Sequence, residues 1–371
     1  MAPRARRIVL ACGLTGLLLV LAEGAARLLP GHETERELAR LREHLLEGTV
    51  QLYEPHPYRV YQLRRASAEV NEYGFGDVEW SVERTPGVPR IVCLGGSTTQ
   101  SGNNHGRRGS YPFLLEKLLE REHGFDFEVL NAGIASWTTA EMLIAWFLTM
   151  QDFAPDVVVL HEAVNDVEPR FRAGFRSDYW HWRTPLQVRG AVGLERWLAR
   201  ESDLYLLLRL RGGSPTLGDV ATRRDALFAP SSDEQGHDHA TSLPFRRNVR
   251  SIAESARAGG ALVVLMTLPT GPHRPDLEVW RADIAQHNAH LRALAGEHGY
   301  LLADAEQAFA AHPALAAQFT DLVHLQPEGN AAKAQLVAAT LAGWLAGLGR
   351  EGRPPPLEPR ERRRSREGGA R

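Results

Sequence analysis

Two segments far apart in the chain carry side chains that could act together on an ester or a similar carbonyl compound. The first, GGSTTQSG over Gly95–Gly102, places Ser97 after an apolar run and two glycines. A serine on such a tight turn exposes its hydroxyl, and the N–H groups beside it can donate to an oxyanion. A phosphate-binding turn and a plain loop are the alternatives, although the P-loop pattern requires a Lys that this segment lacks.

The second segment, TDLVHLQPEGN, contains Asp321 and His324 three residues apart. A hydrolytic serine needs a base whose imidazole is held in one tautomer by a carboxylate. This spacing lets the Asp321 carboxylate reach Nδ1 of the ring and leaves Nε2 for a serine. A surface Asp and a capping His before the helix that Pro327 opens are the alternative. Because the chain has 15 His, the pairing with Asp321 is the informative feature.

Two further segments follow strand-like runs and could supply oxyanion donors. Gly133 lies in LNAGIASWTTAE, where the missing Cβ lets the backbone N–H approach a ligand closely. Asn165 lies in HEAVNDVEP, where its amide can donate to an oxyanion while Asp166 caps the next element. A turn glycine and a loop-capping Asn-Asp pair explain the same residues without catalysis, so both interpretations stay open.

An alternation of strand and helix patterns must position these segments. The apolar strand-like runs are residues 90–94, 127–130, 156–160, 261–266 and 300–303. The helical patterns between and after them are residues 112–122, 140–150, 245–257, 280–298 and 328–348. Mostly apolar strands that alternate with helices indicate a parallel sheet covered on both faces. We predict a three-layer α/β/α fold with a doubly wound, mostly parallel five-stranded sheet and a ligand site at the carboxyl ends of its strands.

Taken in this order, the four segments resemble the SGNH/GDSL hydrolase superfamily from about residue 90 to residue 348, apart from residues 169–243. The GGSTT form, SYPFLLEKLL and LNAGIASWTT are similar to the membrane-anchored bacterial branch of that superfamily. Two departures stand out. The usual Gly-Asp-Ser is Gly95-Gly96-Ser97 here, and the usual Gly-x-Asn-Asp is Ala163-Val164-Asn165-Asp166.

The resemblance implies a flavodoxin-like fold and a role for each candidate residue. Ser97 would be the nucleophile, His324 the base and Asp321 the carboxylate that orients it. The oxyanion hole would come from the N–H groups of Ser97 and Gly133 and the side chain of Asn165. These roles describe a serine esterase or acylhydrolase that works through an acyl-serine intermediate, without a metal or cofactor.

The substrate expected from this resemblance is a small-molecule or glycan ester, such as an O-acyl group of an envelope glycan or lipid. Two alternative functions are compatible with the same sequence features. One is an O-acyltransferase that uses the same residues and replaces water by a sugar hydroxyl. The other is a catalytically silent protein that binds the cell envelope.

The N-terminal segment has the layout of a signal anchor or a signal peptide. Three arginines in MAPRARR precede an uncharged run of 15 residues from Ile8 to Ala22. This run is shorter than the ~20 residues that cross a bilayer squarely, but apolar residues beyond it extend it if Glu23 and Arg27 snorkel. We predict an uncleaved transmembrane helix, with a cleaved signal peptide as the alternative. The catalytic domain would be extracytoplasmic, in the periplasm or at the cell surface, or secreted after cleavage.

The composition of the chain and the placement of its Gly and Pro residues suggest four parts. Residues 1–30 form the anchor, and residues 31–89 form a stalk and N-terminal extension with a helical pattern up to residue 66. Residues 90–348 form the hydrolase domain, with an insertion at 169–243 that could cover the site. The Pro- and Arg-rich residues 349–371 form a disordered basic tail.

The other features of the sequence say less about function. Trp180 and Trp182 in the insertion could stack on a sugar or pack the insertion onto the domain, and His237-Asp238-His239 lacks the further ligands of a metal site. A near balance of 43 basic and 45 acidic residues offers no whole-chain field for nucleic acid. Two cysteines exclude a disulfide scaffold and a multi-cysteine zinc module. The oligomeric state stays open.

Overall fold

The computed structural model describes residues 3–28, 31, 34–35, 37–39, 41–42, 53–65, 69–100, 106–171, 175–179, 194–212, 242–271 and 278–348. Trp180, Trp182, His237–His239 and the tail 349–371 lie outside the described residues, so the interpretations placed on them stay predictions. The chain divides into two compact units. One comprises residues 1–54 with 187–227, and the other residues 55–186 with 228–371.

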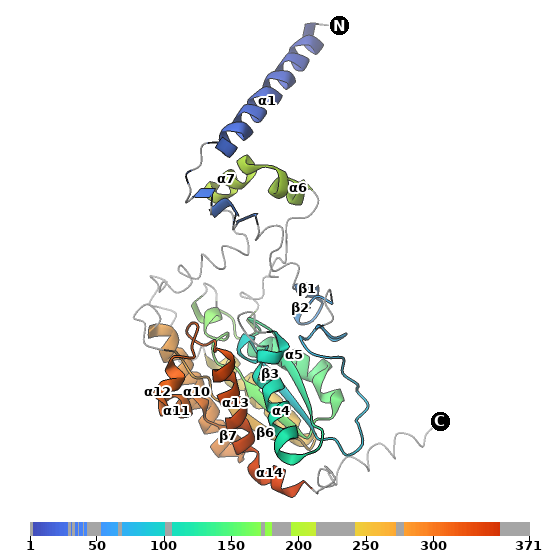
Figure 1. Ribbon diagram of the computed structural model, residues 1–371, viewed down its shortest axis with the longest axis vertical. Coiled ribbons are helices and arrows are strands. Elements are labelled where there is room, and N and C mark those ends of the chain that lie inside the picture. The colour runs from blue at the N-terminus through green and yellow to red at the C-terminus, as the bar shows by residue number, and fades with distance from the viewer. Residues whose placement is uncertain are drawn as a thin grey trace, which may run out of the picture. The chain divides into compact units, whose positions relative to one another are not determined.

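A five-stranded parallel sheet forms the centre of the larger unit (Figure 1). Its strands are β3 (Arg90–Gly95), β4 (Glu128–Gly133), β5 (Val157–His161), β6 (Leu262–Met266) and β7 (Leu301–Ala303). They lie in the order β4-β3-β5-β6-β7, and every neighbouring pair is parallel. The prediction of an α/β fold with a parallel five-stranded sheet is therefore confirmed.

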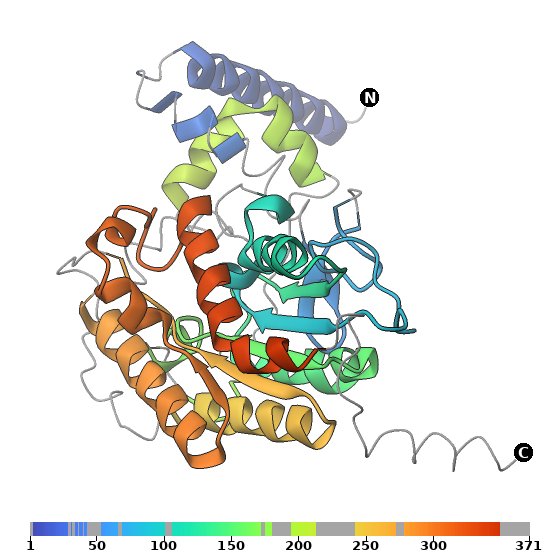
Figure 2. The same cartoon turned by 60° about the horizontal axis from the view of Figure 1, so that its bottom comes forward.

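Helices pack on both sides of this sheet (Figure 2). On one side α4 (Tyr111–His123) packs against α13 (Pro327–Thr340). On the other side α5 (Thr139–Leu148), α9 (Leu243–Ala258) and α10 (Glu278–His298) pack together. Further short elements are β1 (Tyr53–His56), β2 (Val60–Leu63), α3 (Ser97–Gln100), η1 (Arg107–Gly109), η2 (Met150–Phe153), η3 (Glu168–Phe171), α11 (Ala305–Ala310), α12 (Pro313–Ala316) and α14 (Ala342–Gly347).

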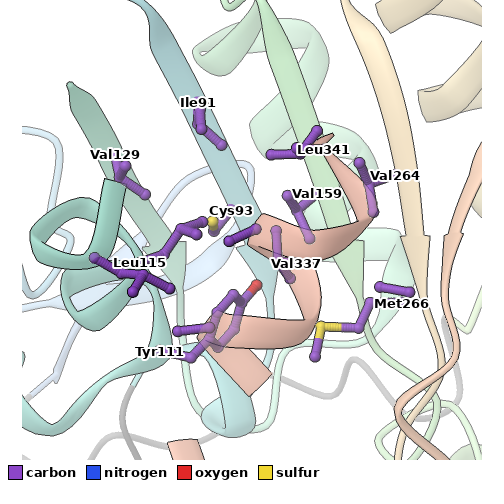
Figure 3. Packing of buried hydrophobic residues seen from close by; sticks show 14 of the residues in the cluster. Ile91, Cys93, Tyr111, Leu115, Val129, Val159, Val264, Met266, Val337 and Leu341 are labelled. Atoms are coloured by element: carbon purple, nitrogen blue, oxygen red, sulfur yellow. The ribbon is translucent and has the colours of Figure 1, made fainter. Parts of the chain in front are cut away.

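The core on the α4–α13 side is apolar and continuous (Figure 3). Alternate residues of the strands, such as Val129, Ile91 and Val159, meet Leu115 of α4 and Val337 of α13. Burial of this apolar area contributes roughly 25 cal/mol for each Å² removed from water. Because the backbone that leads to each strand end is fixed by this packing, the loops at the carboxyl ends start from rigid positions.

The thiol of Cys93 lies inside the same cluster and is fully buried. Burial raises the pKa of this thiol to about 12. A thiol held in its neutral form is a poor nucleophile, so Cys93 fills space in the core.

Residues 53–63 differ from the prediction. The sequence pattern predicts helix up to residue 66. Instead, Tyr53–His56 and Val60–Leu63 form a two-stranded sheet. Pro55 and Pro57 explain the error, because proline removes a helical donor and drives the preceding residue toward extended conformations.

The smaller unit contains α1 (Pro3–Leu28), α6 (Leu194–Glu201) and α7 (Asp203–Gly212). The Glu23 carboxylate of α1 accepts hydrogen bonds from the Ser202 hydroxyl and the N–H of Asp203, at 2.6 and 2.9 Å. It thereby caps the start of α7. Within the described residues, we find no helix with the length and hydropathy needed to span a bilayer.

Candidate active site

The turn after β3 presents Ser97 as the first residue of α3. Two glycines make this turn possible, and each meets a close neighbour. A Cβ at Gly95 would collide with the Thr99 side chain, and a Cβ at Gly96 would collide with the side chains of Glu162 and Asn165. The aspartate that the superfamily usually has before its serine therefore has no room at position 96.

The structure brings Ser97, His324 and Asp321 together, although more than two hundred residues separate the serine from the other two. His324 Nε2 lies 2.8 Å from Ser97 Oγ, and His324 Nδ1 lies 2.7 Å from Asp321 Oδ2. The two side chains of the His–Asp pair are 12% and 26% exposed, so solvent and a substrate can still reach the ring. This is the arrangement in which imidazole can take a proton from a serine hydroxyl.

Asp321 is held in its ionised form by the loop that it closes. Burial by itself raises the pKa of this carboxyl, but hydrogen bonds from the His324 ring and from backbone N–H groups lower it well below its ordinary value. The backbone donors are the N–H groups of Val323 and His324, at 3.0 and 2.8 Å from Oδ1. One carboxyl oxygen thus shapes the loop while the other orients the ring.

Two backbone hydrogen bonds close the loop that carries His324. The Thr320 N–H donates to the His324 carbonyl at 2.9 Å, and the Gln326 N–H donates to the Gln318 carbonyl at 2.7 Å. Helix α13 then begins at Pro327. The fixed φ of Pro327 suits the first turn of a helix. His324 therefore lies shortly before a rigid element.

Asn165 lies beside the nucleophile turn, as the contact with Gly96 shows. Its Nδ2 donates to the Trp137 carbonyl at 2.9 Å and to Glu162 Oε2 at 3.1 Å. The next residue, Asp166, is fully buried and accepts hydrogen bonds from the N–H and hydroxyl of Thr139 and from the Tyr179 hydroxyl. Burial raises the pKa of Asp166 to about 6, while those hydrogen bonds lower it. Asp166 is therefore a structural anchor for this loop.

The structure does not support Gly133 as an oxyanion donor. Its N–H donates to the side chain of Asn131 at 3.1 Å, and the residue is buried. A Cβ at position 133 would collide with the backbone of Gln100, the last residue of α3. Gly133 is needed because α3 packs directly on β4.

Ser136, three residues further, has the features that Gly133 lacks. It is exposed and has a φ of 61°, a left-handed conformation that serine seldom adopts. Its neighbours hold it there, since the Tyr61 hydroxyl donates to the Ala135 carbonyl at 2.5 Å and Asn165 donates to the Trp137 carbonyl. Within the described part of the chain, the Ser136 N–H has no acceptor. No sequence pattern marks this residue, because tertiary contacts impose its conformation.

Replacing Gly133 by Ala should destabilise the protein, because the added methyl group meets the Gln100 backbone. We expect a loss of about 1–3 kcal/mol in the free energy of unfolding, measured by denaturant titration. Gly296→Ala is the matched control, since a Cβ there meets open space within α10. It should raise stability by up to about 1 kcal/mol. Equal stability of Gly133→Ala and the wild type would contradict the close packing of α3 on β4.

Within the described residues, no group of three or more His, Cys, Asp or Glu side chains could hold a metal ion. The residues that meet at the site offer a hydroxyl, an imidazole, a carboxylate and N–H donors.

Comparisons with known proteins identify the family of the chain. Solved structures that the chain resembles include the lipase/acylhydrolase from Enterococcus faecalis and a variant of an acetyl xylan esterase from Geobacillus stearothermophilus. Each has 16% sequence identity and a TM-score of 0.44, over 69% of this chain and 96% of the other. No curated protein matches the sequence. The family model of the GDSL-like lipase/acylhydrolases matches residues 93–332, more than half of the chain, so the protein belongs to that family and is a hydrolase of ester bonds.

Proposed function

We propose that the protein is a serine esterase in which Ser97 is the nucleophile, His324 the base and Asp321 the group that orients it. The observation that carries this proposal is the continuous chain of hydrogen bonds from Ser97 Oγ through the His324 ring to Asp321. A serine hydroxyl with its base and an orienting carboxylate in line is the arrangement required for covalent acyl transfer.

In the first half of the reaction, Ser97 Oγ attacks the ester carbonyl carbon and its proton moves to His324 Nε2. The tetrahedral intermediate collapses when the carbon–oxygen bond to the alcohol breaks and His324 returns the proton to the leaving oxygen. In the second half, water loses a proton to His324 and attacks the acyl-serine. When the Ser97 ester bond breaks, the acid is released and His324 returns the proton to Ser97 Oγ, which restores the hydroxyl.

The oxyanion in this mechanism is stabilised by three donors on neighbouring loops. The N–H of Ser97 is a first-turn donor of α3 that has no acceptor within the helix. Ser136 is an exposed residue, and its N–H has no acceptor among the described residues. The amide of Asn165 lies against Gly96. Donors fixed before the reaction stabilise the developing charge without reorganising.

The substrate class and the fate of the acyl group are tested by product analysis. We propose hydrolysis of a small-molecule or glycan ester, such as an O-acyl group of the cell envelope. Incubation with an acetylated xylose oligosaccharide and an unacetylated sugar acceptor should release free acetate in amounts equal to the ester consumed. Transfer of most acetyl groups to the acceptor would contradict hydrolysis and indicate an acyltransferase.

We also propose that residues 1–30 attach the protein to the membrane with the catalytic unit on the extracytoplasmic side. The support is the sequence pattern of three arginines followed by an uncharged run. The full-length protein should sediment with membranes and resist extraction by carbonate, whereas a chain that begins at residue 31 should stay in the supernatant. Recovery of the full-length protein from the supernatant would contradict the anchor, and N-terminal sequencing would identify cleavage.

A further inference from the structure

Glu162 is a buried carboxyl group at the centre of the loop that carries Asn165. Its side chain is 3% exposed, and one oxygen accepts hydrogen bonds from three successive backbone N–H groups. These donors are Ala163, Val164 and Asn165, at 2.9, 2.7 and 2.8 Å from Oε1. One oxygen of a single carboxyl group therefore fixes the course of this loop.

The second oxygen of Glu162 faces the catalytic residues. Oε2 accepts a hydrogen bond from Asn165 Nδ2 at 3.1 Å and lies 2.3 Å from the position that a Cβ on Gly96 would take. Within the described residues, no Lys, Arg or His forms an ion pair with Glu162. A buried carboxyl group that lacks a cation is costly to retain, which favours a role in the site over a contribution to stability.

We propose that Glu162 is a positioning residue that sets the plane of the Asn165 amide and holds its nitrogen beside the turn of Ser97. This inference rests on the proposed function, because it assigns Asn165 to the oxyanion hole. Glu162 and the Trp137 carbonyl accept the two hydrogens of Nδ2 from different directions, so the amide cannot rotate freely. A developing oxyanion is a stronger acceptor than either neutral partner and can draw one of these hydrogens to itself.

The protonation of Glu162 supports this assignment. Burial raises the pKa of Glu162 to about 8, although the backbone N–H groups lower it, so the carboxyl group is mostly neutral at pH 7. A neutral group places no negative charge beside the oxyanion. Its oxygen still accepts from Asn165, since a carboxyl oxygen retains lone pairs when protonated.

Glu162→Gln separates the two tasks of the side chain. The Gln carbonyl can keep the three backbone hydrogen bonds, whereas its NH₂ group replaces the acceptor that faces Asn165 Nδ2 by a donor. We expect kcat for p-nitrophenyl acetate to fall about tenfold, with KM changed less than twofold, because only stabilisation of the transition state is affected.

A double-mutant cycle with Asn165→Ala tests whether Glu162 acts through Asn165. Asn165→Ala alone should lower kcat by about 10²–10³. Adding Glu162→Gln to it should lower kcat by less than about twofold more, since the amide to be positioned is absent. The control is Glu141→Gln, another buried carboxyl group, which caps α5 through Thr138. It should lower the melting temperature and leave kcat unchanged in both backgrounds.

Several results would overturn the proposal. One is a wild-type kcat in Glu162→Gln, and another is the same tenfold loss in the Asn165→Ala background. If Glu162→Gln fails to fold, Glu162→Asp keeps the carboxyl group one methylene further from Asn165, and a wild-type kcat in that folded variant would equally contradict it. Labelling of Ser97 by a fluorophosphonate in the wild type separates these failures from failure of the proposed function. A folded wild type that neither reacts with the fluorophosphonate nor hydrolyses p-nitrophenyl acetate would contradict both the proposed function and the role of Glu162.

Discussion

Replacing Ser97 by Ala should lower kcat by about 10⁶, the order of loss that follows removal of a triad nucleophile. The hydroxyl supplies the atom that forms the covalent intermediate, and without it only the oxyanion donors and substrate binding remain. The melting temperature should change little, because Ser97 is half-buried and its hydroxyl has one described partner, the His324 ring. Steady-state hydrolysis of p-nitrophenyl acetate, with thermal unfolding measured in parallel, tests this expectation.

His324→Ala supplies the control for Ser97→Ala. Residues that act as one unit are not additive, so the double variant should be about as slow as either single variant. A double variant that is slower by the product of the two single effects would show that the hydroxyl and the imidazole act separately. Such a result would contradict the hydrogen-bonded pair seen at 2.8 Å.

Asp321→Asn should lower kcat by about 10⁴ while the loop around it keeps its shape. The Asn carbonyl can still accept the N–H groups of Val323 and His324, which Asp321 Oδ1 accepts in the wild type. Its NH₂ group, however, faces His324 Nδ1 and stabilises the tautomer that carries the proton on Nε2. That tautomer cannot take the proton of Ser97. An activity within tenfold of the wild type would contradict the orienting role.

The difference in stability between the wild type and Asp321→Asn should depend on pH. Because the folded pKa of Asp321 is lowered, this group stabilises the fold above the ordinary pKa of Asp, and the contribution is lost as the pH falls. Wild type should therefore be more stable than Asp321→Asn at pH 7, and the difference should shrink as the solution is acidified. A difference in the free energy of unfolding that is constant from pH 7 to pH 3 would exclude this linkage.

The sheet could be predicted from the sequence because its strands are mostly apolar, and a glycine or a polar residue ends each strand or directly follows it. The convergence of Ser97 with His324 and Asp321 follows from the same topology, since the carboxyl ends of parallel strands share one edge. The prediction over residues 53–63 failed because the helical pattern was followed past Pro55 and Pro57, where strands form instead.

The residues around the oxyanion hole could be predicted from the sequence only in part. A glycine after a strand indicates close approach but does not identify the neighbour, and for Gly133 that neighbour is the backbone of Gln100. The left-handed φ of Ser136 is imposed by contacts of the residues on either side. Glu162 gave no pattern of its own, because its importance comes from the direction of its two oxygens.

The most direct test of the account is the mass of the folded protein after treatment with a fluorophosphonate. We expect a single covalent adduct on the wild type, mapped to Ser97 by peptide sequencing, and no adduct on Ser97→Ala. An unmodified wild type that is folded by circular dichroism, or an adduct on a different residue, would contradict the assignment of Ser97 as the nucleophile.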